Sequence, residues 1–342
     1  MSLKKVNSQE LEKAVEYAAA TGKTMYIEGF AGTGKSTTIH EAAKKLGMEV
    51  IDIRVSTLDI GDLVMRMPNA DKTAMMELIN QDLVRDKPTI YLFDEFLHGT
   101  KNIQKMCYQI FLDRKMGTYR LPKGSAIFAL ANPQDEVDSD GLDRPMWDRM
   151  DMKVYLEFDL KKWEKWAYEH DVRAEVISFV DMFADKVINT DVDGMPLTPR
   201  TWERVSKALD DNVYQQMLPS ETGLMFKSYL DKITAFKDVY KYLDGKEKLD
   251  DKLDIQFAFI AAMTNKITKN PKDATVLKWY DGKVKGMREE VKVFGNVSVL
   301  NRHKQLVSKG ETRKYFSEVD KEIQKQLMVV WKDLGYLMDN KM

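Results

Sequence analysis

The sequence has very little cysteine or histidine: one cysteine, Cys107, and four histidines in 342 residues. A single thiol excludes an internal disulfide framework, and the scattered histidines lack the paired spacing of a metal site. Neither sign of charge dominates, because 53 basic residues face 54 acidic ones. Balanced charge produces no global field toward nucleic acid or anionic lipid, so binding to either is not supported.

Long apolar runs are also missing. No segment reaches the ~18 apolar residues that suggest a membrane span, and residues 1–10 lack the apolar core of a signal peptide. Together with the reducing interior that one cysteine favours, these absences predict a cytoplasmic protein without membrane contact. The sequence does have length and 44% hydrophobic residues, which is enough to bury a core in more than one domain.

Short apolar runs alternate with helical patterns in the first half of the chain. Strands are predicted at Met25–Ile27, Glu49–Val55, Thr89–Phe93 and Ser125–Leu130, and helices at Gln9–Ala20 and Thr37–Leu46. This alternation predicts an α/β fold with a parallel sheet that is flanked by helices and binds ligands at the carboxyl ends of its strands. Beyond about residue 158 the composition is helical, with helices expected at Leu160–Ala184 and Thr201–Leu209 and a loop at Val187–Pro199.

A phosphate loop is the most specific motif. Gly29–Ser36 reads Gly-Phe-Ala-Gly-Thr-Gly-Lys-Ser and fits the pattern G-x-x-x-x-G-K-S, placed after a predicted strand and before a helix. Its glycines allow backbone N–H groups and the helix dipole to meet phosphate charge. Nucleotide contacts are expected from Gly29, Phe30, Ala31, Gly32, Thr33, Gly34, Lys35, Ser36 and Thr37. Lys35 would reach the β and γ phosphates, and Ser36 would bind Mg²⁺.

Polar side chains follow two further predicted strands. Asp94 and Glu95 end the apolar run that begins at Thr89, and Asn132 follows the run that begins at Ser125. Asp94 suits Mg²⁺ held through water, and Glu95 suits the base that polarises an attacking water. An amide at Asn132 could orient that water or contact the γ phosphate.

In this order the motifs resemble the AAA+ superfamily, and more narrowly its MoxR-like, dynein-related branch. Gly29–Ser36 resembles Walker A, Leu92–Glu95 resembles Walker B and Leu130–Pro133 resembles sensor 1. Arg114–Gly124 is similar to the hairpin that precedes sensor 1 in that branch. The resemblance extends from about Thr24 to Leu209.

Two arginine segments complete the resemblance. Leu142–Met150 resembles the arginine-finger segment, which implies that Arg149 projects into the nucleotide of a neighbouring subunit. Arg144, five residues earlier, competes for this role, although the Asp-Arg-Met ending favours Arg149. Leu197–Trp202 resembles sensor 2, which implies that Arg200 contacts the γ phosphate from its own lid.

Two other segments have competing interpretations. Ser56–Pro68 lies where this branch carries an insert that reaches the pore of a ring, but its Val-Met-Arg-Met sequence departs from the usual pattern, so we expect a packed surface loop. Lys266–Arg288 holds seven basic and two acidic residues and could be a nucleic-acid patch. A solvated helix face is favoured, because two glutamates follow at once.

The resemblance implies an ATPase that uses ATP and Mg²⁺, assembles into a ring, expected to be a hexamer, and remodels or assembles a protein partner. Some family members act with a von Willebrand A-domain protein. The expected domains are an AAA+ α/β domain (1–158), a helical lid with sensor 2 (159–212) and a helical C-terminal extension (213–342). The alternatives are a slow, nucleotide-gated binding module and a motor on nucleic acid. The presence of Glu95 and Arg149 favours turnover over the first, and balanced charge disfavours the second.

Overall fold

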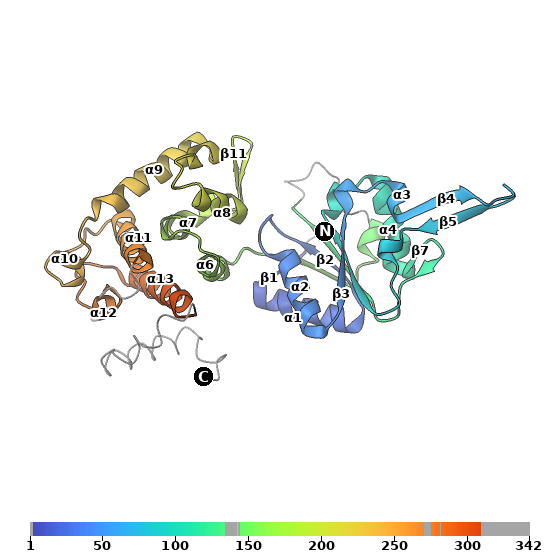
Figure 1. Ribbon diagram of the computed structural model, residues 1–342, viewed down its shortest axis with the longest axis horizontal. Helices are drawn as coiled ribbons and strands as arrows, with labels where there is room; N and C mark the ends of the chain where they lie inside the picture. The colour runs from blue at the N-terminus through green and yellow to red at the C-terminus, as the bar shows by residue number, and fades with distance from the viewer. Residues whose placement is uncertain (1–2, 134–141, 143, 270–274, 281, 309–342) are drawn as a thin grey trace. The chain divides into compact units, whose positions relative to one another are not determined.

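The computed structural model describes residues 3–133, 142, 144–269, 275–280 and 282–308. The chain divides into two compact units, residues 1–159 and 160–342 (Figure 1). A bilayer-spanning helix is absent from the part of the chain that the structure describes, where every helix is too short or too polar for that purpose.

A six-stranded parallel sheet forms the centre of the first unit, in the order β1-β10-β2-β9-β6-β3. The strands are β1 (Lys4–Val6), β2 (Thr24–Glu28), β3 (Glu49–Arg54), β6 (Thr89–Asp94), β9 (Ala126–Ala131) and β10 (Met152–Leu156). The four strands predicted from the sequence are confirmed as β2, β3, β6 and β9. The short strands β1 and β10 are not evident from the sequence, because neither forms a continuous apolar run.

Helices cover both faces of this sheet. The main ones are α1 (Ser8–Thr21), α2 (Lys35–Leu46) and α4 (Lys101–Asp113). Successive side chains of a strand point to opposite faces, so Ile90 and Leu92 pack with α1 and α2, whereas Tyr91 and Phe93 pack with α4. This burial on both faces explains why the central strands are continuously apolar in sequence. Gly47, with φ of 65°, ends α2 as its C-cap.

Shorter elements connect the strands. They are the 3-10 turns η1 (Val55–Thr57), η2 (Gln81–Leu83) and η3 (Phe96–His98), the helices α3 (Ile60–Leu63) and α5 (Arg144–Trp147), and two hairpins, β4 (Val64–Pro68) with β5 (Met75–Ile79) and β7 (Lys115–Met116) with β8 (Tyr119–Arg120). The second hairpin confirms the one predicted within Arg114–Gly124.

The β4–β5 hairpin projects from the first unit (Figure 1). Met65 pairs with Leu78 and Met67 with Met76, so these four side chains share one face, and each is between 44% and 48% exposed. The expectation of a packed surface loop is therefore wrong. Cross-strand hydrogen bonds satisfy the backbone of this segment, and its methionines do not have to be buried for it to be ordered.

The second unit is mainly helical. It contains α6 (Leu160–Glu169), α7 (Ala174–Val187), α8 (Pro199–Lys207), η5 (Tyr214–Met217), α9 (Ser220–Ala235), α10 (Tyr240–Leu243), α11 (Leu253–Lys269), α12 (Thr275–Tyr280), α13 (Glu289–Ser308) and a hairpin of β11 (Thr190–Val192) and β12 (Met195–Leu197). Its core includes Phe179, whose ring lies 5.3 Å from that of Trp202 and 4.8 Å from that of Phe226, measured between centroids.

Two sequence expectations for this unit are corrected, and others lie outside the described residues. The helix expected at Leu160–Ala184 is two helices, because Asp171 adopts a left-handed φ of 59° between them. The loop expected at Val187–Pro199 contains the β11–β12 hairpin, whose turn is made by Asp193 and Gly194 at positive φ. Residues 309–342 of the expected extension are not among the described residues.

A buried carboxyl group on α6 makes the stability of this unit depend on pH. The Glu164 side chain is fully buried, with Lys161 Nζ 3.1 Å from Glu164 Oε1 and 3.2 Å from Asp181 Oδ1. Burial, together with the hydrogen bond from Glu164 to Asp181, raises the pKa of Glu164 from 4.5 to about 9. Between pH 4.5 and about 9, the folded form therefore retains a proton on Glu164 that the unfolded chain has lost.

Replacing Glu164 with Gln should flatten the pH dependence of stability. The raised pKa gives the wild type a contribution that is complete below pH 4.5 and is lost as the pH rises to about 9. Gln keeps the shape of the side chain without an ionisable proton. The Tm of E164Q should therefore increase relative to the Tm of the wild type as the pH rises. Thermal melts from pH 5 to 9 measure this. The exposed Glu169 on the same helix is the control, and parallel curves for E164Q and the wild type would contradict the assignment.

Candidate active site

The loop between β2 and α2 depends on its glycines. Gly32 and Gly34 have φ of 77° and 92°, values that glycine adopts far more easily than other residues. A Cβ at Gly29 would lie 3.0 Å from the carbonyl oxygen of Leu156 at the end of β10. The Gly29 N–H donates to the carbonyl of Ala131 at the end of β9, at 3.2 Å. The loop is thus fitted closely against both neighbouring strands.

The amino end of α2 is open to an anion. Gly34 is its N-cap and supplies no side-chain hydrogen bond to the first turn. The N–H groups of that turn and the helix dipole therefore face the loop without a side-chain acceptor. Ser36 and Thr37 lie in the same turn, with Ser36 half-buried and Thr37 exposed.

Lys35 lies at the centre of the site and is only 8% exposed. Its ammonium donates to the carbonyl oxygen of Gly29, to that of Phe30 at 2.9 Å, and to Oδ1 of Asn132 at 3.2 Å. These acceptors are neutral oxygens. The charged oxygens of a phosphate would bind the ammonium more strongly, since charge-assisted hydrogen bonds are roughly twice as strong as neutral ones.

The order of the strands places the predicted polar residues at one edge of the sheet. β9 lies between β2 and β6, and all three run parallel. Asn132 after β9 is therefore between the phosphate loop after β2 and the carboxylates at the end of β6, with ~4.8 Å between neighbouring strands. The Lys35–Asn132 hydrogen bond joins two of these segments directly.

Glu95 has an unusual backbone conformation. Its φ of 55° and ψ of 39° lie in the left-handed region, and its N–H donates to Oδ1 of Asp94 at 2.9 Å. This conformation costs a non-glycine residue about 1–2 kcal/mol. Such strain persists where the surroundings hold it in place, which is common at functional sites.

Two partners of Glu95 are not identified by sequence reasoning. The Ser56 hydroxyl donates to Oε2 of Glu95, and Nε of Arg54 is 4.0 Å from Oε1. Arg54 ends β3, which pairs with β6, and Ser56 lies in η1 directly after it. Their one signal in the sequence is that Arg54 lies within the strand predicted at Glu49–Val55 and Ser56 directly follows it, which does not reveal that β3 and β6 are neighbours.

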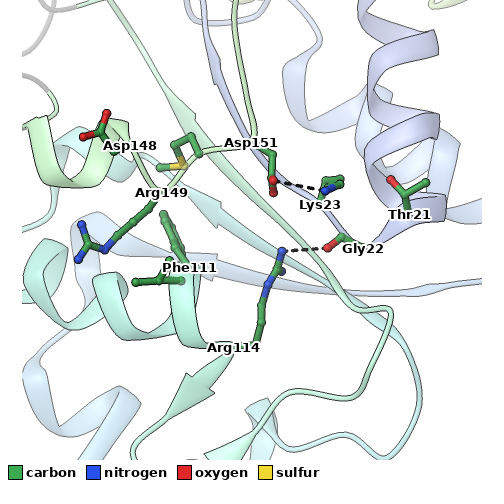
Figure 2. A pocket seen from close by; sticks show the side chains of 10 residues that line it. Thr21, Gly22, Lys23, Phe111, Arg114, Asp148, Arg149 and Asp151 are labelled. Carbon is green, nitrogen blue, oxygen red and sulfur yellow. Dashed lines mark hydrogen bonds and ion pairs between the residues drawn. The ribbon is translucent and has the colours of Figure 1, made fainter.

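Arg149 lies at the other edge of the sheet. It precedes β10, whose first residue Met152 pairs with Met25 near the start of β2. With Lys23, Arg114, Asp148 and other residues it lines a cavity of about 310 Å³ (Figure 2). The Arg149 side chain extends away from Gly22 and Lys23 in this view. No residue of the phosphate loop is among those that line this cavity.

The remaining predicted arginines have different settings. Arg144 is the first residue of α5 and is exposed, at the same edge as Arg149. Asp143, within the same predicted segment, is not among the described residues. Arg200 is exposed in the first turn of α8, in the second unit. Its role as sensor 2 stays a prediction.

A family comparison covers the site as a whole. Residues 25–158 match the family described as "ATPase family associated with various cellular activities (AAA)". They include the phosphate loop, Asp94, Glu95, Asn132 and Arg149. Residues 25–158 form an AAA domain. The predicted fold class, a parallel AAA+ sheet flanked by helices and followed by a helical C-terminal part, is confirmed.

Solved structures similar to the chain are distant from it. The RuvB Holliday junction branch migration motor of Thermotoga maritima is 18% identical, with a TM-score of 0.38, over 68% of this chain and 75% of that chain. NtrX from Brucella abortus in complex with ADP is 13% identical, with a TM-score of 0.41, over 89% of this chain and 68% of that chain. No curated protein matches the chain.

Replacing Lys35 with Ala should weaken ATP binding by about 100-fold or more, because the AAA domain would lose a buried cation facing the phosphates. A fluorescent ATP analogue measures this binding. The exposed Lys44, on the same helix, provides the matched control K44A, which should bind normally. Equal affinity in K35A and K44A would remove Lys35 from the phosphate site.

Proposed function

We propose that the chain is a Mg²⁺-dependent ATPase of the MoxR-like branch of AAA+ proteins. The observation that carries this proposal is the hydrogen bond between Lys35 and Asn132, at the edge where β6 ends in Asp94 and is followed by Glu95. Within an AAA domain, this arrangement supplies a cation for phosphate, an amide for the γ phosphate and two carboxylates.

The residues present fit the proposed nucleotide and metal. The first turn of α2 has no side-chain cap, so its N–H groups would be available to a phosphate, and the close packing at Gly29 excludes a side chain there. Ser36 and Asp94 supply oxygen ligands of the kind that Mg²⁺ prefers. Mg²⁺ bound to ATP would neutralise charge that develops during phosphoryl transfer. Glu95, held by Ser56, would accept a hydrogen bond from the attacking water.

Glu95→Gln should keep ATP binding and lose hydrolysis, because the amide preserves the shape of the side chain and removes the base. Phosphate release under saturating ATP, together with nucleotide affinity, measures the two effects. Glu157 follows β10 at the same edge of the sheet, is exposed and pairs with Lys5, so E157Q is a matched control that should turn over normally. Hydrolysis by E95Q at the wild-type rate would place the base elsewhere.

We propose that Arg149 acts on the nucleotide of a neighbouring subunit. The phosphate loop follows the carboxyl end of β2, whereas Arg149 precedes the amino end of its neighbour β10. These strands have five residues each, and a strand of that length spans ~16 Å. An arginine side chain does not cover this length. A ring of subunits, which we expect to be a hexamer, would bring Arg149 to a second site.

Arg149→Ala should lower kcat by about 10³-fold while ATP affinity changes little, because a finger stabilises charge that is largest in the transition state. Mixing inactive R149A subunits with inactive E95Q subunits should restore hydrolysis. The mixed ring has interfaces that combine an intact Glu95 with an intact Arg149. R144A, mixed in the same way, tests the competing finger. Failure of both mixtures, with subunit exchange shown by fluorescence transfer, would contradict action in trans.

The remaining assignments extend this proposal. We propose that residues 159–212 form a lid from which Arg200 contacts the γ phosphate, and that residues 213–342 form a helical extension. A cytoplasmic protein partner would be remodelled by the ring, and a von Willebrand A-domain protein is one candidate. Affinity capture with the E95Q variant in ATP tests for such a partner.

A further inference from the structure

The Arg149 guanidinium lies against an aromatic ring. Its Cζ is 5.0 Å from the ring centroid of Tyr108, which lies on α4. Its Nη1 donates to the carbonyl oxygen of Pro145. Its Nε is buried and has no hydrogen-bond partner within the part of the chain that the structure describes. The ring and one carbonyl are thus its two identified attractive contacts.

We propose that Tyr108 is a positioning residue that orients the Arg149 side chain for the reaction in the neighbouring subunit. This inference rests on the proposed function, in which Arg149 is the arginine finger. Tyr108 would not contact the nucleotide itself. It would act by restricting where the guanidinium of Arg149 can lie.

The Pro145 carbonyl cannot perform this task alone. Pro145 belongs to α5, four residues before Arg149, so it moves together with the segment that it would have to fix. Tyr108 belongs to a different element. A neighbouring face of α4 is anchored in the core through Ile103, Cys107 and Phe111, and Tyr108 packs against the same cluster. The Tyr108 ring therefore connects Arg149 to the rigid body of the AAA domain.

The electrostatics of the contact support the same role. A buried N–H without an acceptor is unfavourable, the more so on a charged group. The face of an aromatic ring carries negative potential and attracts a guanidinium, most strongly where water is excluded. Tyr108 is partly buried against the core cluster that includes the buried residues of α4. Its ring therefore provides this attraction where water is partly excluded.

The backbone near Arg149 is fixed independently of Tyr108. Lys153 Nζ donates to the carbonyl oxygens of Trp147 at 3.0 Å and Met150 at 2.6 Å, and Met146 and Met150 are buried. What remains to be restricted is the side chain of Arg149, which has many rotamers. Loss of the Tyr108 ring should therefore release the guanidinium without displacing the segment.

The test compares Tyr108→Leu, which removes the ring, with Tyr108→Phe, which keeps it. We expect Y108L to lower kcat for ATP hydrolysis by about 5- to 30-fold, the range that a cation–π contact supports. The KM for ATP should stay within about twofold, since Arg149 acts in the transition state. Y108F should hydrolyse ATP at nearly the wild-type rate. Melting curves check folding, and Tyr108→Met replaces Y108L if that variant is unfolded.

Two further readouts separate positioning from packing. In an Arg149→Ala background, Y108L should have no additional effect on kcat, because its target is gone. Adding E95Q subunits to Y108L subunits should raise hydrolysis, because E95Q supplies an intact finger to an intact Y108L site. A packing defect inside the Y108L site would not be corrected by a neighbour.

The outcomes also separate this inference from the proposed function. If R149A keeps full activity, Arg149 is not a finger, and both proposals fail. If R149A is inactive but Y108L matches the wild type, the finger stands and Tyr108 has no positioning role. The same conclusion follows if Y108L lowers kcat equally with and without Arg149, or if E95Q subunits fail to stimulate Y108L although they stimulate R149A.

Discussion

The contact between Lys35 and Asn132 depends on one constraint, the order of parallel strands in the AAA sheet. Because β9 lies between β2 and β6, the residues that follow these strands converge at one edge. The Lys35 ammonium donates hydrogen bonds to two carbonyl oxygens of its own loop and to the side-chain amide oxygen of Asn132, which follows β9. This arrangement places the phosphate loop before α2 at the same edge as Asp94 and Glu95.

The same sheet separates two groups of candidate functional residues, one at each end of its parallel strands. Its carboxyl edge holds the phosphate loop, Asp94 and Glu95, and its amino edge holds Arg149 and the cavity beside it. The length of the strands prevents one copy of the domain from joining these two edges. Assembly of subunits is therefore a natural consequence of the proposed reaction. Under the proposed function, the surroundings of Arg149, including Tyr108, would bear on a site that belongs to another copy.

Much of the first unit can be predicted from sequence because the signals are local. The central strands are continuous apolar runs, and the phosphate loop combines glycines, Lys35 and Ser36 within a few residues. Other elements have no such signal. The β4–β5 hairpin exposes Met65 and Met67, so apolar residues there do not indicate burial. The break between α6 and α7 depends on the left-handed conformation of Asp171. Glycine is the usual sequence signal for that conformation, and Asp171 does not provide it.

The sequence alone was enough to identify the phosphate loop and the polar residues Asp94, Glu95 and Asn132, because each of them comes directly after a run of strand-forming residues. A single cysteine also excludes an internal disulfide framework. Only the tertiary structure decided which of these residues meet. The contacts of Glu95 with Ser56 and of Arg149 with Tyr108 join residues about 40 positions apart. Such contacts depend on which strands and helices become neighbours, and that is settled by packing of the whole sheet rather than by any short segment.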